Sequence, residues 1–361
     1  MDPLTHTLAG AVLVRAGLGR GAPLVTATAI IASNAPDVDV AAYFKDEYFA
    51  LAFRRGITHG LPALLVWPFV IAGAVLLFDR LYRRRRRPPP PPVQPRVLLL
   101  VSAVAVATHP VLDWLNNYGM RWLLPFSGRW SYGDAVFIID PWIWLLLGAA
   151  LFLSYEWSKR ARMRWAVLAI LATAAVAATG ALPMLVKLVW IAGLGTLAAV
   201  QRASLRLGTR GVRVLGSAAV AYMALLVLID PVETLIARRH AERAGVTDIV
   251  TVMVAPVPAN PFSSTLVIAT ADHYRIGTFH WLPVPTVRLD SANVLVGGSA
   301  ISDRAARAGP MHDYLVWSRY PFFTVRSSAE GLVVSAGDAR YTRQPGAGSL
   351  AGVTVIVSGD N

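Results

Sequence analysis

Histidine and aspartate recur together in the first 140 residues of a chain that contains no cysteine. Without thiolates, any bound metal would have to be held by imidazole and carboxylate groups. His109 and Asp113 stand four residues apart, which places both side chains on one face of a helix. That spacing lets one imidazole and one carboxylate reach the same divalent cation, and the alternative is a hydrogen bond or cap at a helix end.

Other segments carry further candidate ligands. They are His6, Asp37, Asp39, His59, Asp134 and Asp140. Each has a structural alternative: Asp37 and Asp39 suit a turn that caps the next helix, and His59 suits a membrane interface beside a helix that Thr58 would cap. A metal site therefore depends on whether the fold brings these segments together.

The elements that must position these residues are apolar segments. Of the 361 residues, 55% are hydrophobic and 15% are charged, and the mean hydropathy is +0.51. A helix needs about 20 apolar residues to cross a bilayer. Six segments approach that length: 61–82, 97–115, 136–155, 165–183, 184–200 and 212–230. The sequence predicts a mainly α, polytopic transmembrane helical bundle, with two shorter apolar stretches in 8–34 forming a re-entrant or buried hairpin.

Beyond Asp230 the pattern changes to short, β-branched stretches broken by proline and glycine, such as 248–254. These stretches are typical of strands, and no long apolar run occurs among them. Residues 1–230 are therefore expected to form the transmembrane domain, with an Arg- and Pro-rich loop at 83–96. Residues 231–361 are expected to form a small, mostly β, soluble domain.

The net charge of +13 comes from basic residues that cluster beside the apolar segments, so membrane lipids rather than nucleic acid are the expected partners. The positive-inside rule makes the loops 83–96, 156–164 and 201–213 cytoplasmic. The β domain is then extracytoplasmic, and the candidate ligands share the outer level of the membrane. Ionisable residues at membrane depth usually face a polar cavity with partners. Their convergence predicts a site for a divalent metal, zinc or manganese, that activates water.

Five motifs carry a family resemblance. They are Asp2-Pro-Leu-Thr-His6, Asn34-Ala-Pro-Asp37-Val-Asp39, Arg55-Gly-Ile-Thr-His59, His109-Pro-Val-Leu-Asp113-Trp114 and Tyr132-Gly-Asp134-Ala-Val-Phe-Ile-Ile-Asp140-Pro-Trp142. Together they resemble the bacterial membrane-bound metal-dependent hydrolases, a family also described as LexA-binding and inner-membrane-associated. The resemblance covers roughly residues 1–155 and implies a multi-pass protein of the bacterial inner membrane. The order of the ligands is more distantly similar to that of zinc-dependent phospholipase C and S1/P1-type nucleases.

The resemblance implies a hydrolase that acts on a phosphoester or lipid-like substrate. Its metal ligands would be His6, Asp37 or Asp39, His59, His109 and Asp113, with Asp134 or Asp140 as a further ligand or neighbour. Asp37 or Asp140 would orient water or accept its proton, and Arg55 would steady an anionic group. Family members often have histidine where this chain has Arg55. Arginine cannot ligate a metal, so Arg55 either holds a phosphate or leaves one metal position missing.

Three other functions remain open at this stage. In the first, the His and Asp cluster only braces the helices of a non-enzymatic membrane protein, and the β domain binds a partner. In the second, the protein regulates a cytoplasmic transcription factor, which the predicted topology disfavours. The third is a transporter, whose ionisable residues would be expected nearer the midplane of the membrane.

Overall fold

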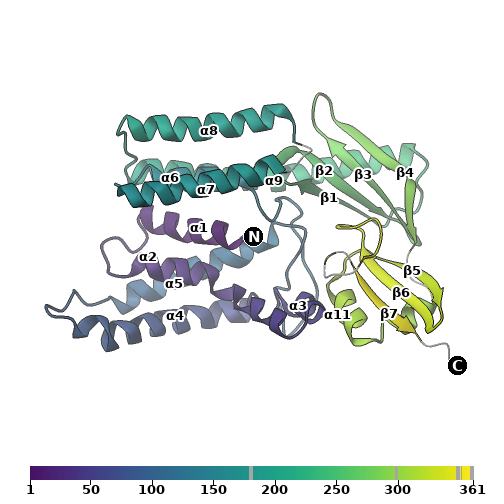
Figure 1. Cartoon of the computed structure of the whole chain (residues 1–361), viewed down its shortest axis with the longest axis horizontal. Helices are drawn as coiled ribbons and strands as arrows, with labels where there is room; N and C mark the ends of the chain where they lie inside the picture. Colours follow the sequence, from purple (N-terminus) through teal and green to yellow (C-terminus); the bar gives the residue numbers. More distant parts are fainter. Residues whose placement is uncertain (179–181, 297–299, 347–349, 351, 358–361) are drawn as a thin grey trace. The chain divides into compact units, whose positions relative to one another are not determined.

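Five helices in the described residues are long and apolar enough to cross a membrane. The computed structural model describes residues 1–178, 182–296, 300–346, 350 and 352–357. The five helices are α4 (Leu61–Leu81, followed by the 3-10 helix η2, Arg83–Arg85), α5 (Pro95–Trp114), α7 (Lys159–Ala178), α8 (Met184–Arg202) and α9 (Thr209–Arg243). The predicted polytopic, mainly helical fold is confirmed (Figure 1). The end of the predicted span 165–183 falls on residues 179–181, which lie outside the described residues.

The span predicted at 136–155 is wrong. Its helix, α6 (Pro141–Phe152), has 12 residues, and at ~1.5 Å per residue it is about 18 Å long against a ~30 Å hydrocarbon core. The helix begins late because Asp140 caps it, accepting hydrogen bonds from the backbone N–H groups of Trp142 and Ile143 at 2.8 and 3.2 Å. Pro141 follows in the first turn, where its missing N–H costs no helical hydrogen bond.

Contacts divide the chain into two compact units. The helical unit comprises Met1–Asp37, Arg55–Val227 and Val257–Pro261, and the second, β-containing unit comprises Val38–Arg54, Leu228–Pro256 and Phe262–Asn361. The domain boundary predicted between residues 230 and 231 lies inside helix α9.

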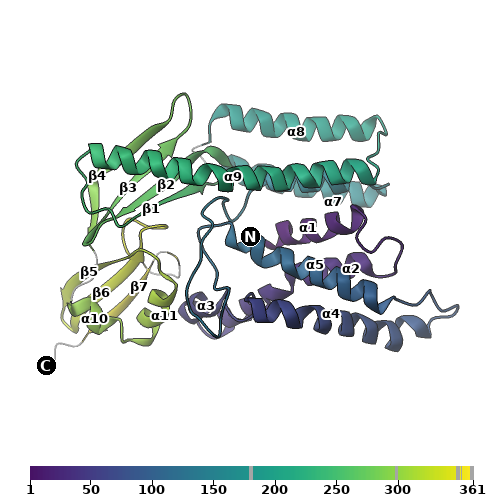
Figure 2. The ribbon, with the colours of Figure 1, turned by 180° about the vertical axis from the view of Figure 1, so that it is seen from behind.

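A short hairpin of α1 (Pro3–Arg15) and α2 (Val25–Asn34) lies at the centre of the helical unit, beside α5 and α6 (Figures 1 and 2). The two helices approach closely at Gly10, where a Cβ atom would lie 2.6 Å from Ser33 Oγ and 2.8 Å from the Ala29 carbonyl oxygen. Glycine is therefore required at this crossing. The hairpin buries Leu8 and Val12 against α6 and α9.

Arginine side chains close the helical unit at the end of α1 that is farther from His6. Arg15 donates to the carbonyl oxygen of Ser154, just beyond α6. Arg213, in the first turns of α9, donates through Nε to the Ala16 carbonyl oxygen at 2.7 Å. Carbonyl groups at helix C-termini lack intrahelical donors, so these arginines satisfy them and join three helices.

The second unit holds two sheets. A four-stranded sheet has the order β1 (Thr251–Val257), β2 (Asn260–Ala269), β3 (His273–His280), β4 (Thr286–Val296), and a three-stranded antiparallel sheet has the order β5 (Pro321–Ser328), β6 (Gly331–Asp338), β7 (Val353–Val357). Three short helices accompany them: α3 (Glu47–Phe53), α10 (Ala300–Ala305) and α11 (Gly309–Trp317). The predicted β-rich C-terminal region is confirmed, and the end of the predicted domain 231–361 falls on residues 358–361, outside the described residues.

A saturated carboxylate anchors the three-stranded sheet to the segment that follows α11. Asp338 is fully buried and accepts hydrogen bonds from Ser318 Oγ at 2.6 Å, from the Arg319 N–H at 2.7 Å and from Arg340 Nε at 2.9 Å. Burial raises the pKa of the Asp338 carboxyl, but the Arg340 guanidinium and these donors outweigh it and hold the pKa below its usual range.

Candidate metal centre

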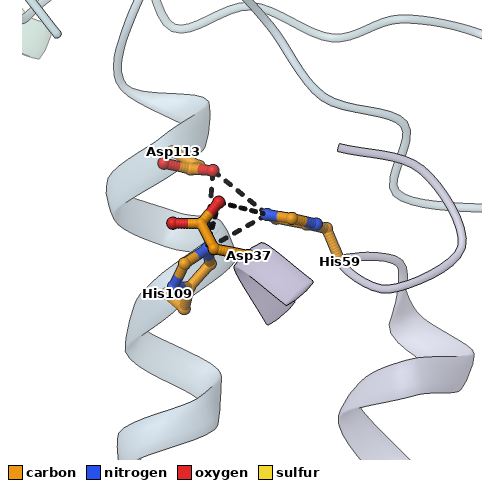
Figure 3. A group of neighbouring side chains, drawn as sticks. All are labelled: Asp37, His59, His109 and Asp113. Carbon is orange, nitrogen blue, oxygen red and sulfur yellow. Dashed lines mark hydrogen bonds and ion pairs between the residues drawn. The ribbon is translucent and has the colours of Figure 1, made fainter. Parts of the chain in front are cut away.

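Four side chains from three separate segments converge in the helical unit. His109 and Asp113 lie one turn apart near the C-terminal end of α5, His59 lies just before α4, and Asp37 lies in the 3-10 helix η1 (Ala35–Phe44) that follows α2. One ligand atom from each lies within 4.8 Å of all the others. Figure 3 shows the two carboxylates and two imidazoles directed at a common point.

The spacing of these atoms fits one metal ion. His59 Nε2 lies 3.0 Å from His109 Nε2, 3.3 Å from Asp113 Oδ2 and 3.7 Å from Asp37 Oδ1. His109 Nε2 lies 3.6 Å from Asp113 Oδ2 and 3.8 Å from Asp37 Oδ1. Ligands at ~2.0–2.1 Å from a tetrahedral zinc ion are about 3.3 Å apart. The four atoms can therefore surround a zinc-sized cation with small shifts.

The orientation of His109 also suits a ligand. Its Nδ1 lies 2.7 Å from the Ser33 carbonyl oxygen, which can only accept, so Nδ1 must carry the proton. In the neutral ring, Nε2 then presents its lone pair to the centre of the cluster. His59 Nδ1 lies 2.9 Å from the Thr58 hydroxyl, and its Nε2 faces the same centre. A hydrogen bond to the outer ring nitrogen is how proteins orient metal-binding histidines.

Arg55 is fixed to Asp113 by a two-point ion pair. Its Nε lies 2.9 Å from Asp113 Oδ2 and its Nη2 donates to Oδ1 at 3.1 Å, while Nη1 donates to Asn116 Oδ1 at 2.8 Å. The guanidinium is buried, and its Cζ lies 4.6 Å from the centre of the Tyr118 ring. The Asp113 carboxylate occupies the Nε and Nη2 edge of the Arg55 guanidinium, which is the edge that a phosphate would bind. A phosphate could therefore reach that edge only by displacing Asp113 from Arg55.

His6 packs against two members of the cluster, His109 and Asp113. Its ring stacks on that of His109 at 3.8 Å between centroids, and its Nε2 lies 3.3 Å from Asp113 Oδ1. The amino nitrogen of Met1 contacts the same oxygen. His6 therefore lies beside Asp113, outside the group of four atoms that share one centre.

Asp37 is the most accessible member of the group. Its side chain is 17% exposed, whereas those of His59, His109 and Asp113 are fully buried. Burial raises the pKa of the Asp37 carboxyl, but the hydrogen bond from His59 and the nearby His109 outweigh it, so the pKa lies well below its usual range. Asp37 is ionised at neutral pH and marks the side from which water can reach the cluster.

Besides His6 and Arg55, three further predicted site residues lie outside the group of four: Asp39, Asp134 and Asp140. Asp39 forms an ion pair with Arg54 at 3.3 Å. Asp134 has a left-handed backbone (φ 49°) in a loop whose neighbouring residues bond to the carbonyl groups at the end of α5.

Asp140, expected to orient water or accept its proton, instead uses one carboxylate oxygen as the cap of α6 and the other to accept from the Tyr222 hydroxyl at 3.0 Å. Burial raises the pKa of Asp140 to about 6.

Sequence reasoning missed two residues that hold the site. Asn116 is fully buried and connects Arg55 to the Tyr118 backbone N–H, which donates to Asn116 Oδ1 at 3.0 Å. Its position just after α5, three residues beyond Asp113, was the available signal. Ser33 acts through its backbone carbonyl, which no side-chain pattern reveals.

The range of the chain that contains this cluster matches a known family. A model of the YdjM inner membrane protein family matches residues 1–184. The chain belongs to this family. It is also 28% identical, over 169 residues, to the uncharacterized protein YfhP of Bacillus subtilis (strain 168), a match that covers 43% of the chain and 46% of that relative, so the chain spans about half the length of YfhP. No solved structure matches the chain.

Membership of the YdjM family makes the chain an inner membrane protein, which agrees with its five apolar helices. The prediction of a multi-pass inner membrane protein, which the resemblance implied, is therefore confirmed. The comparisons give no support to the distant similarity to zinc-dependent phospholipase C or S1/P1-type nucleases.

Proposed function

We propose that this YdjM-family protein is a membrane-embedded, metal-dependent hydrolase. The observation that carries the proposal is a mostly buried site in which the ligand atoms of His59 and His109 lie 3.0 Å apart and 3.3–3.8 Å from those of Asp113 and Asp37, with all four within 4.8 Å of one another. A bound zinc or manganese ion would polarise a phosphoryl or carbonyl oxygen and lower the pKa of a bound water toward ~7.

The four side chains divide into two roles. His59, His109 and Asp113 are fully buried and mutually within 3.0–3.6 Å, so they suit the three protein ligands of a catalytic metal site. Asp37 lies farther from both imidazoles, at 3.7 and 3.8 Å, and is partly exposed. An ionised carboxylate at that place orients a water molecule and accepts its proton. Arg55 positions Asp113 through its two-point ion pair.

The position of the site supports a substrate class. Asp113 is the last residue but one of α5, an apolar helix that can cross the membrane, so the cluster lies at the end of a span rather than at its middle. A lipid or another amphipathic phosphoester presents its polar linkage at that depth. Such a substrate fits the proposal without requiring entry into the hydrocarbon core.

A topology belongs to the same proposal. The arginines that close the opposite end of the helical unit, such as Arg15 and Arg213, are typical of the cytoplasmic side. The metal cluster and the β-rich unit would then be extracytoplasmic. A periplasmic reporter enzyme fused after the last residue should be active, and activity of a cytoplasmic reporter at that position would contradict this topology.

Two variants test the division of roles. His109→Ala should lose both the metal and the hydrolysis of a chromogenic phosphodiester or a fluorescent phospholipid. Asp37→Asn should keep most of the metal and lose hydrolysis by ~10²–10⁴-fold, the usual contribution of a general base. His312→Ala, at an exposed position of the β-rich unit, is the matched control and should change neither quantity. Full activity in His109→Ala would refute the proposal.

A structural brace is the second candidate, and the buried pair of Arg55 and Asp113 favours it. In that case the cluster joins α5, η1 and the segment before α4 through charge alone. A brace needs no metal, so stability that does not respond to chelators or to added zinc would support it over the hydrolase.

A further inference from the structure

A cavity lies in the helical unit, away from the metal cluster. Its volume is about 330 Å³, and α1, α6, α7 and α8 supply its walls. The lining is apolar and aromatic, with Trp144, Trp165 and Trp190 on three different helices. Arg162 is the one charged side chain in the wall. None of the proposed metal ligands takes part.

The dimensions of the cavity match one leaflet of a bilayer. Along α7 its lining extends from Arg162 to Ala172, which lie ten positions apart and so about 15 Å apart along the helix at ~1.5 Å per residue. The hydrocarbon core is ~30 Å thick, so this length is half of it. The walls α7 and α8 are candidate spans, and only 11% of each apolar window is buried within the protein. The cavity is therefore a slot bordered by helices that face lipid.

The charge at the end of the slot identifies a partner. Arg162 lies in the first turn of α7 with Lys159 and Arg160, and this turn contains no acidic residue. All three side chains are exposed, and none forms an ion pair within the described part of the chain. The positive end of a helix macrodipole adds to the same potential. A ligand with an apolar chain and a negatively charged group would fit a slot that is apolar along its length and ends in cations without an ion-pair partner among the described residues.

We propose that this slot binds an anionic phospholipid, with one acyl chain between α6, α7 and α8 and its phosphate at Arg162. Apolar walls of leaflet length accept the chain, and Arg162, the charged residue of the wall, selects the headgroup. Basic pockets between transmembrane helices are known to recognise such headgroups. The site does not depend on the proposed hydrolase activity, because it shares no residue with the metal cluster.

Lipid titration of delipidated protein in detergent, followed by native mass spectrometry, tests the site. The probes are dioleoyl phosphatidylglycerol and dioleoyl phosphatidylcholine. Wild type should bind one phosphatidylglycerol more tightly than phosphatidylcholine. Arg162→Gln should weaken phosphatidylglycerol binding about fivefold, the effect of one basic residue near the headgroup, and should weaken phosphatidylcholine less, because choline balances the charge of its phosphate. Arg160→Gln is the control, since Arg160 is outside the cavity wall.

A cavity-filling variant tests the acyl slot separately. Ala169→Phe places a ring in the cavity and should weaken both lipids at least tenfold, whereas Val167→Phe, on an exposed face of α7 outside the wall, should bind as wild type does. If Ala169→Phe aggregates on size exclusion, Gly148→Leu fills the slot from α6, because a Cβ at Gly148 meets only Trp165, at 3.7 Å.

Equal affinity of wild type for the two lipids would overturn the proposal. Unchanged lipid binding in the folded cavity-filling variant would also overturn it, since ordinary annular lipid would then explain the signal.

Discussion

Replacing Arg55 by methionine should expose the cost of removing the two-point cationic partner of Asp113. The two groups contact at 2.9 and 3.1 Å and both are buried, so removal of the guanidinium leaves the Asp113 carboxylate away from water with the Met1 amino group and His6 beside one oxygen. Breaking a buried pair in this way costs about 3–5 kcal/mol of the free energy of unfolding. At ~2–4 °C per kcal/mol, Arg55→Met should lower the melting temperature of metal-free protein by about 10 °C.

The assay is thermal unfolding in detergent, followed by tryptophan fluorescence, with and without zinc. Arg54→Met is the matched control, because Arg54 is partly exposed and its pair with Asp39 spans 3.3 Å, which should contribute at most ~1 kcal/mol. Zinc should reduce the loss in Arg55→Met, since a cation beside Asp113 replaces part of the missing charge. A loss no greater than that of Arg54→Met would refute this account of the pair.

Two further predictions concern carboxylates outside the cluster. The pKa of Asp140 is raised to about 6, so the stability that its protonated form contributes is present below pH ~4 and is lost as the pH rises through 6. Asp140→Asn keeps an oxygen to cap α6, and its melting temperature should rise relative to wild type between pH 4.5 and 7; a constant difference would contradict the assignment. Asp338→Asn weakens the buried pair with Arg340 and should lower stability by a few kcal/mol while metal content stays at the wild-type level. Metal loss in that variant would show that the β-rich unit is needed for the site.

The membrane-spanning helices could be predicted from the sequence because each contains a long apolar run. The spans at α4, α5, α7, α8 and α9 follow from runs of about 20 apolar residues. The error at 136–155 arose because apolarity continues through residues that do not form helix. Asp140 and Pro141 mark where α6 begins, and capping signals of this kind outweigh hydropathy in fixing a helix boundary.

The candidate site was predictable in its members more than in its arrangement. The four-residue spacing of His109 and Asp113 placed both on one face of α5. Nothing in the local sequence separates Asp37 from Asp39, two residues apart, because the choice depends on how η1 packs. Likewise, the charge of Arg55 could be read as phosphate binding, whereas the fold uses it to hold Asp113.

Metal content is the most direct test of the central claim that His59, His109, Asp113 and Asp37 form a metal centre. Detergent-purified wild type and a His59→Ala, His109→Ala double variant should be compared by plasma mass spectrometry after identical dialysis. We expect about one zinc or manganese ion per wild-type chain and none in a double variant that still elutes as folded protein. Absence of metal from wild type, or equal metal in both proteins, would contradict the claim and leave the cluster as a structural brace.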